Sequence, residues 1–468
     1  MRRCASALAA LLGACAISPQ TASAHGIVGR ADLPIPVWLF SWAAAVVLVV
    51  SFVALSTLWT TPQLQERRLR LIARLPSLLQ IVPALIGLAL FALVIYSGLD
   101  GASVETVNFS VTFIYVVFWV GLPLASALLG DIFPALSPWR TTARALTWAG
   151  RALLPARAAR PRLPERLGVW PAVAGLVGFG WLELVYVYKD RPSTLAALSL
   201  GYFAVMVAGM LVYGVQEWEA RCDGLALYLA TVARIAPLEW GAGAVRRRRP
   251  LSALTDMEIG PGMVVFICAL IGVTTFDGFS NGGYWKLIYP PVQELLEQVG
   301  LGTIPALEIT YTIGLLACVG LVRLVYLVGI RGVAGVSGRF SSGQLTRSFA
   351  HTLVPIALAY VLAHYFSFLV WQGQAVGYLI SDPLGNGTDY LGTGHWQIDY
   401  NVISFAAIWY VQVAALIAGH VGGLALAHDR SLAIYEDPAE AVRSQYWMLG
   451  VMVAFTSFGL WLLSAVGT

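Results

Sequence analysis

Residues 348–372 read SFAHTLVPIALAYVLAHYFSFLVWQ, a run that contains no Asp, Glu, Lys or Arg. About 20 apolar residues in an α-helix cross the roughly 30 Å hydrocarbon core of a bilayer, so this run is long enough to span one. Comparable runs occur at about 34–59, 77–99, 107–130, 169–188, 194–216, 262–280, 304–329, 401–426 and 446–466. The sequence therefore predicts an all-α, polytopic transmembrane helical bundle of about ten spans.

The composition agrees with this prediction. Of the 468 residues, 58% are hydrophobic and only 12% are charged, and the mean hydropathy is +0.74. These values exclude a soluble globular chain, and no polar segment is long enough for a separate soluble domain. The lipid bilayer is the expected partner, and nucleic acid is not. The five cysteines form no paired framework, so no disulfide is predicted.

The amino terminus has the pattern of a secretory signal peptide. Residues 1–24 combine a basic start, an apolar stretch and the small-residue end Ala22-Ser23-Ala24. Removal of this leader would leave residues 25–468 as a single transmembrane domain. Its first residue, His25, would offer an α-amine and an imidazole, a chelate suited to copper. The alternative is a loose lipobox at Leu12-Gly13-Ala14-Cys15, which would leave an acylated cysteine.

Charge asymmetry predicts the orientation. With the mature amino terminus outside, the inner loops carry 22 arginines and 13 acidic residues, a net charge of +9, whereas the outer segments carry 4 basic and 11 acidic residues, a net charge of −7. Excess positive charge marks the cytoplasmic side. We therefore expect a multi-pass protein of a bacterial inner membrane, with both termini outside. Within the inner loops, residues 218–235 have an apolar helical pattern that predicts a helix along the inner surface.

Ionisable residues within the spans are the main functional candidates, because burying them in a membrane is costly. Counting about 1.5 Å per residue from the inner boundary places Glu183, Asp277 and His364 at about 20 to 24 Å. All three thus fall in the outer half of the membrane. Glu308 begins the next span in the same zone, and His395 can reach it from an outer loop.

Carboxylates and imidazoles at one level can hold a divalent metal that activates water, or they can relay protons. On the first interpretation, Asp277, Glu183 and Glu308 are the candidate catalytic acid or base groups. Asp277 and His364 are candidate metal ligands together with His395, and His25 is a further one at the amino terminus. The structural alternative is that the glutamates bond neighbouring helices and that Asp277 caps a helix.

A second group of histidines lies toward the inner side, at His351, His420 and His428. His364 and His420 differ by roughly 10 Å along the membrane normal, which disfavours them as axial ligands of one haem. Histidines near the interface commonly bond carbonyl groups. Haem is therefore not an expected cofactor.

Several short stretches together resemble a bacterial integral membrane family known as fenitrothion hydrolase. They are AHGIVGR at 24–30, FWVG at 118–121, PWR at 138–140, FDGFS at 276–280 and SQYWML at 444–449. The resemblance extends from the leader to the last helix. It implies hydrolysis of the aryl phosphotriester bond of organophosphorus insecticides, with release of a nitrophenol and with a companion subunit. The buried carboxylates and imidazoles would hold the metal that assists this hydrolysis. The resemblance implies no particular catalytic residues.

Two other functions fit the same residues. In the first, the protein is a transporter or a copper- or metal-handling membrane protein, in which His25 and the acidic outer loops collect a cation and the buried carboxylates relay it inward. In the second, it is a non-catalytic membrane subunit whose basic inner loops dock a partner protein.

Overall fold

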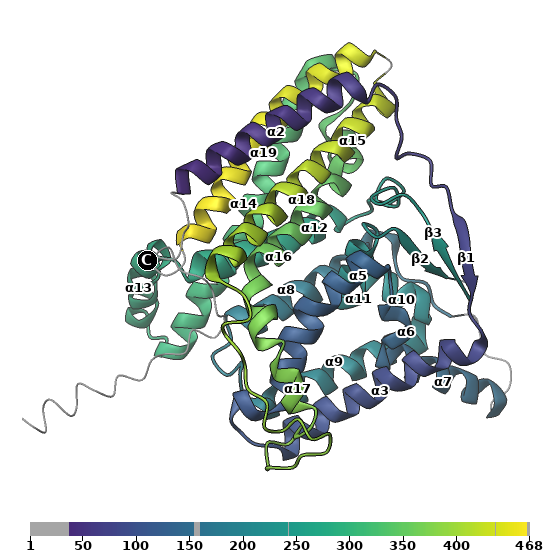
Figure 1. The fold of residues 1–468 in the computed structure, drawn as a ribbon, viewed down its shortest axis with the longest axis vertical. Coiled ribbons are helices and arrows are strands. Elements are labelled where there is room, and N and C mark those ends of the chain that lie inside the picture. Colours follow the sequence, from purple (N-terminus) through teal and green to yellow (C-terminus); the bar gives the residue numbers. More distant parts are fainter. Residues whose placement is uncertain (1–36, 154–159, 242, 436, 466–468) are drawn as a thin grey trace, which may run out of the picture.

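The chain folds as a bundle of membrane-spanning helices. The computed structural model describes residues 37–153, 160–241, 243–435 and 437–465, and these are mostly helical (Figure 1). Within them, nine helical segments are long and apolar enough to cross a membrane. The predicted all-α, multi-pass architecture is confirmed, and the bundle requires a lipid bilayer around it. The leader and His25 lie outside the described residues.

The spanning segments follow the predicted runs. They are α2 (Val37–Leu58), α3 (Ser77–Asp100), the continuous run of α4 (Phe109–Thr112), η3 (Phe113–Gly121) and α5 (Leu122–Leu129), α8 (Trp170–Leu184), α9 (Pro192–Tyr213), α12 (Met263–Ser280), α14 (Thr303–Ser337), α15 (Ser342–Phe349) with α16 (Leu353–Gln372), and α18 (Phe405–Ile434). The tenth predicted run ends beyond the described residues, and α19 (Pro438–Ala465) occupies its place.

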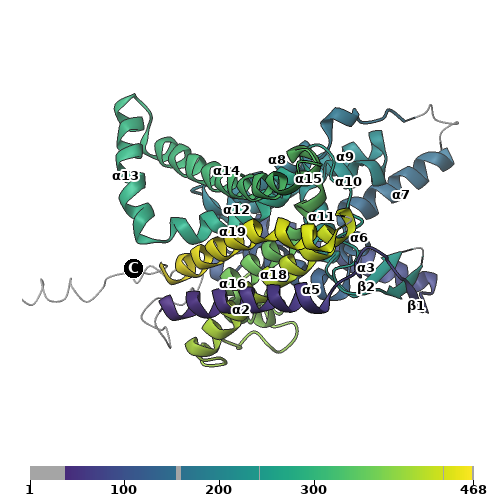
Figure 2. The same ribbon diagram turned by 90° about the horizontal axis from the view of Figure 1, so that it is seen from above.

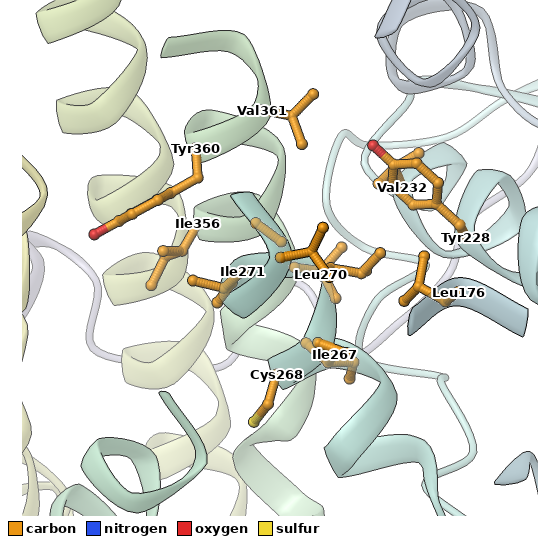
Figure 3. Packing of buried hydrophobic residues seen from close by; sticks show 14 of the residues in the cluster. Leu176, Tyr228, Val232, Ile267, Cys268, Leu270, Ile271, Ile356, Tyr360 and Val361 are labelled. Atoms are coloured by element: carbon orange, nitrogen blue, oxygen red, sulfur yellow. The ribbon is translucent and has the colours of Figure 1, made fainter. Parts of the chain in front are cut away.

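The helices form two groups, which Figures 1 and 2 show from two directions. One group contains α2, α12, α14, α16, α18 and α19, and the other contains α3, α5, α8 and α9. The groups meet where α12 packs on α8 and α16 packs on η3. Figure 3 shows apolar side chains of α8, α12 and α16 filling this region. Interdigitated apolar side chains hold the helices together there through dispersion contacts.

Close helix contacts depend on small residues. A Cβ added to Gly272 on α12 would lie 2.6 Å from the backbone Cα of Val319 on α14, and one added to Gly419 on α18 would lie 2.7 Å from the carbonyl oxygen of Pro355 on α16. Backbones approach this closely only when one partner has no side chain. The glycines therefore set the spacing of the helices around the centre of the bundle.

One prediction about the inner loops is wrong. Residues 218–235 do not lie along the surface: they contain the end of α10 (Val215–Arg221) and then α11 (Gly224–Ala233), in which eight of ten residues are buried. α11 packs against α5 and α8 inside the bundle. Its side chains are apolar all round, so it has no polar face to present to water. Asp223 caps its amino end and also accepts 2.7 Å hydrogen bonds from Trp139 and Tyr202.

Smaller elements close the two ends of the bundle. At the inner end, three short antiparallel strands pair in the order β1-β3-β2; they are β1 (Arg70–Arg74), β2 (Leu238–Gly241) and β3 (Ala244–Arg247). The helices α6 (Phe133–Leu136) and α7 (Pro138–Leu153) lie near them. The opposite end carries α13 (Gly283–Gln298), α17 (Ala375–Leu379) and the loop that follows α17. We call this the outer end, following the predicted orientation.

Candidate functional site

Two of the predicted residues meet directly in the outer half of the bundle. The His364 Nε2 atom on α16 lies 2.8 Å from the Asp277 Oδ2 atom on α12. Their side chains are only 5% and 1% exposed. Asp277 lies in the last turn of α12, and the amide of Asn281 donates to its Oδ1 atom at 3.1 Å. The sequence thus places the carboxylate at the outer end of the helix, where a polar loop residue supports it.

Tyr365 extends this pair to a third span. Its hydroxyl donates to the Oε1 atom of Glu183 at 3.2 Å and also lies within hydrogen-bonding reach of Asp277. Glu183 is 3% exposed, and Tyr365 is 1% exposed. Because the tyrosine follows His364 in sequence, one turn of α16 presents both groups to the two carboxylates. We call the four residues His364, Asp277, Tyr365 and Glu183 the outer cluster.

A π-helix supplies the wall beside Glu183. The nine residues of η3 (Phe113–Gly121) have this wider helical geometry, which often marks functional sites. The Trp119 indole lies within electrostatic reach of both Glu183 and Tyr365. Its ring lies 4.4 Å from that of Phe179 and 5.4 Å from that of Tyr228, measured between centroids. These rings shield the outer cluster from lipid.

A small cavity adjoins the histidine. It has a volume of about 20 Å³ and is lined by Thr274, Gly278, Tyr360, Ala363, His364, Leu416 and Gly459. A cavity of this size holds about one water molecule. The outer cluster therefore has room for a water on the side of His364, and the polar groups around it can exchange protons with that water.

Glu308 and His395 do not join the outer cluster. The Glu308 Oε1 atom accepts a 3.2 Å hydrogen bond from the backbone nitrogen of Val187, which ties α14 to the loop after α8. His395 is exposed in the loop after α17, beside Asp389. Hydrogen bonds, first of all from Ser381, lower the pKa of that aspartate. Both predicted residues lie near the outer end without contributing to one shared site.

The predicted metal ligands do not gather into one group among the described residues, and His25 lies outside those residues. Within them, no group of three or more His, Cys, Asp or Glu side chains is arranged to hold a metal ion. Asp277 and His364 give two ligands, and Glu183 reaches them only through a hydroxyl. Metal centres of the hydrolytic type use three protein ligands and a bound water. The arrangement instead forms a hydrogen-bonded chain of acid and base groups.

The inner histidines occupy separate positions. The Nε2 atom of His428 bonds the Trp59 carbonyl at 2.8 Å, and its Nδ1 atom bonds the Gln445 side chain at 3.1 Å. The Nδ1 atom of His420 bonds the carbonyl oxygen of Leu416 at 2.8 Å. His428 is therefore engaged through both ring nitrogens, whereas His420 is engaged through one.

Sequence reasoning missed two members of this region, Tyr365 and Trp119. Neither residue is charged, so a search for ionisable groups in apolar runs passes over them. Their positions in the sequence give a signal: Tyr365 directly follows the candidate His364, and Trp119 lies in an aromatic run. The chain matches no family model, no curated protein and no solved structure in the comparisons with known proteins.

Proposed function

We propose that this protein is a proton-coupled membrane transporter in which the outer cluster binds and releases protons. The observation that carries the proposal is the outer cluster itself: His364 bonds Asp277, the Tyr365 hydroxyl bonds Glu183 and lies within reach of Asp277, and no side chain is more than 5% exposed. Chains of buried acid and imidazole groups within spans are typical of proton relays in pumps and transporters. The charge asymmetry places the cluster nearer the outside of a bacterial inner membrane.

The surroundings of the cluster support proton exchange. Two carboxylates that share one hydroxyl donor in a water-excluded site favour a shared proton, because ionising both there is costly. Asn281 connects Asp277 to the outer loop, and the water-sized cavity adjoins His364 on the other side. A proton accepted at one end of the chain can thus be released at the other through local reorientation of a hydroxyl and a water.

Proton flux into liposomes tests this proposal. The purified protein is reconstituted with an entrapped pH-sensitive dye, and a potassium gradient with valinomycin sets the membrane potential. Flux is measured with and without external metal cations. We expect Asp277→Asn and Glu183→Gln to abolish the protein-dependent flux. Glu308→Gln is the matched control, since it neutralises a carboxylate at the outer end that lies outside the chain. The proposal fails if wild-type flux equals that of empty liposomes or of Asp277→Asn under every condition.

One observation favours a second function, the hydrolysis of aryl phosphotriesters. An imidazole paired with a carboxylate beside a water-sized cavity is the arrangement of a general base. His364 would take a proton from the water while Asp277 orients the ring and stabilises its positive charge. The cavity has no room for the ester itself, so the substrate would have to lie beyond it. Release of nitrophenol from fenitrothion by membranes, lost in His364→Gln, would support this function even where no proton flux is found.

A further inference from the structure

A second cavity lies inward of the outer cluster. It has a volume of about 60 Å³ and is lined by residues of α12, α14, α16, α18 and α19. Its lining includes Ile271, Tyr326, Thr352, His420, Met448 and Met452. Tyr360 separates it from the first cavity: the tyrosine lines that cavity, and its ring lies 6.2 Å from that of His420. Neither the proton chain nor the hydrolytic alternative uses this second cavity.

His420 presents an unused ligand atom there. Its side chain is 0% exposed. The bond of Nδ1 to a carbonyl oxygen assigns the ring proton to Nδ1, because a carbonyl only accepts. The Nε2 atom then carries a lone pair, and no group among the described residues donates to it. A buried polar atom without a partner is costly and requires an explanation. A bound ligand that accepts the lone pair of this nitrogen would explain why the atom has no partner in the protein.

Sulfur atoms gather around the same cavity. Met448 and Met452 line it from α19 and are one helical turn apart, so they share a face. They are two of only seven methionines in the chain. Cys268 lies one turn before Ile271 on α12, a pair that Figure 3 shows, and it lies within electrostatic reach of Tyr326. Thioether and thiolate sulfurs are soft ligands that select Cu(I), and imidazole also suits copper.

We propose that this second cavity binds Cu(I) through His420, Met448 and Met452, and that Cu(I) is the cargo of the transporter proposed above. No charged side chain lines the cavity, and the desolvation cost of an ion rises steeply with its charge. A monovalent soft ion is therefore preferred over a divalent one.

The titratable groups near the ion are few. The hydroxyls of Tyr326 and Tyr360 donate to backbone carbonyls at 2.7 and 3.4 Å, and the Cys268 thiol lies one turn away on α12. None of these groups carries a charge that would repel the ion, and the hydroxyls are engaged elsewhere. The exposed Arg323 on α14 lies within electrostatic reach of Cys268 and is positively charged, but it does not line the cavity. The identification of Cu(I) as cargo rests on the proposed transport function, whereas binding of the ion rests on the cavity alone.

Binding is tested on the full chain in nanodiscs, under reducing and anaerobic conditions. Cu(I) is titrated in competition with a chromogenic Cu(I) chelator, in a His25→Ala background so that the amino terminus cannot contribute. We expect one tightly bound Cu(I) per chain. X-ray absorption at the copper edge is expected to show both sulfur and imidazole nitrogen neighbours. Coordination by nitrogen and oxygen alone would overturn the assignment.

Matched variants isolate the ligands. The double variant Met448→Leu/Met452→Leu keeps apolar volume but removes both sulfurs, and we expect it to weaken Cu(I) binding by at least about 100-fold. Met210→Leu/Met263→Leu is the control, because both residues are buried, at 0% and 4% exposure, away from the cavity. His420→Gln is expected to weaken binding similarly to the double variant. Unchanged affinity in His420→Gln or in the cavity double variant would overturn the proposal.

The two proposals fail in different ways. Cu(I) binding without any copper- or proton-dependent flux would refute transport and leave the ion site in place. Proton flux that persists while Cu(I) fails to bind would refute the ion site and leave the outer cluster as a proton relay. Silver ion, a redox-inert mimic of Cu(I), serves as the probe in the flux assay.

Discussion

Replacing Tyr365 with phenylalanine is the sharpest test of the outer cluster. The substitution removes one oxygen, the atom that donates to Glu183 and lies within reach of Asp277, and preserves the ring that contacts those of His364 and Phe368. If protons pass along this chain, removing the hydroxyl slows them although both carboxylates and the imidazole remain. We expect protein-dependent proton flux to fall by at least about tenfold, equivalent to roughly 1.4 kcal/mol on the barrier.

The effect on stability follows from the geometry. A hydrogen bond to a charged group contributes about 1.5 to 3 kcal/mol. The Tyr365–Glu183 contact, at 3.2 Å, is longer than the distance that hydroxyl donors prefer, so the lower value applies. Tyr202 donates to the carboxylate of Asp223 at 2.7 Å, a favourable length that points to the upper value. Tyr202→Phe is therefore expected to destabilise the protein more than Tyr365→Phe does.

Tyr202→Phe and Tyr365→Phe form a matched pair, because the variant expected to lose more stability is not the one expected to lose proton flux. Thermal unfolding in detergent measures stability, and dye-loaded liposomes measure flux. We expect Tyr202→Phe to lose more stability and keep its flux, and Tyr365→Phe to lose less stability and most of its flux. Equal flux in Tyr365→Phe and the wild type would refute the role of the hydroxyl. A loss of flux in both variants would mean that flux follows stability rather than the proton chain.

Three further outcomes are expected. Burial, and next a neighbouring carboxylate, raises the pKa of Asp131 to about 7. The folded protein therefore keeps a proton on this side chain above about pH 4, where the unfolded chain has released it. The stabilisation that this bound proton provides is lost as the pH rises toward 7. Asp131→Asn should therefore gain roughly 2 kcal/mol over the wild type between about pH 5 and pH 8, and a pH-independent difference in melting temperature would contradict this. Gly272→Ala should cost about 1 to 3 kcal/mol, because its Cβ would meet the backbone of α14 at 2.6 Å, whereas Gly320→Ala, with open space, should be neutral or stabilising in the same melts. Asp429 accepts hydrogen bonds of 2.5 to 3.2 Å from N–H groups of the 59–65 segment, so Asp429→Asn should cost about 3 kcal/mol and speed hydrogen exchange there; unchanged exchange would refute this anchoring.

The depth in the membrane of the buried ionisable groups could be predicted from the sequence. A spanning helix rises by a fixed 1.5 Å per residue, so counting from the inner boundary placed Glu183, Asp277 and His364 at one depth. The structure links these three side chains through hydrogen bonds. The direction of each side chain around its helix could not be predicted, because these helices are apolar on all sides and show no periodic polar face.

Because the direction of each side chain around its helix could not be predicted, some of the residues predicted to share a site lie apart in the structure. Glu308 lies at the expected depth, yet it faces the backbone of the loop after α8 rather than the outer cluster. His420, Met448 and Met452 come from two different helices, and nothing in their spacing shows that they line one cavity. The prediction for α11 was wrong for a different reason: the helix is apolar on every side, a pattern that favours burial rather than a surface position.

The sequence by itself determined the order and approximate length of the spans, because the bilayer imposes a length and a polarity on every segment independently of its neighbours. Its charge asymmetry predicts their orientation. Only the tertiary structure decided which side chains meet. Helix packing rotates each span about its axis, and this rotation depends on close contacts such as those of Gly272 and Gly419, which lie between residues far apart in the chain.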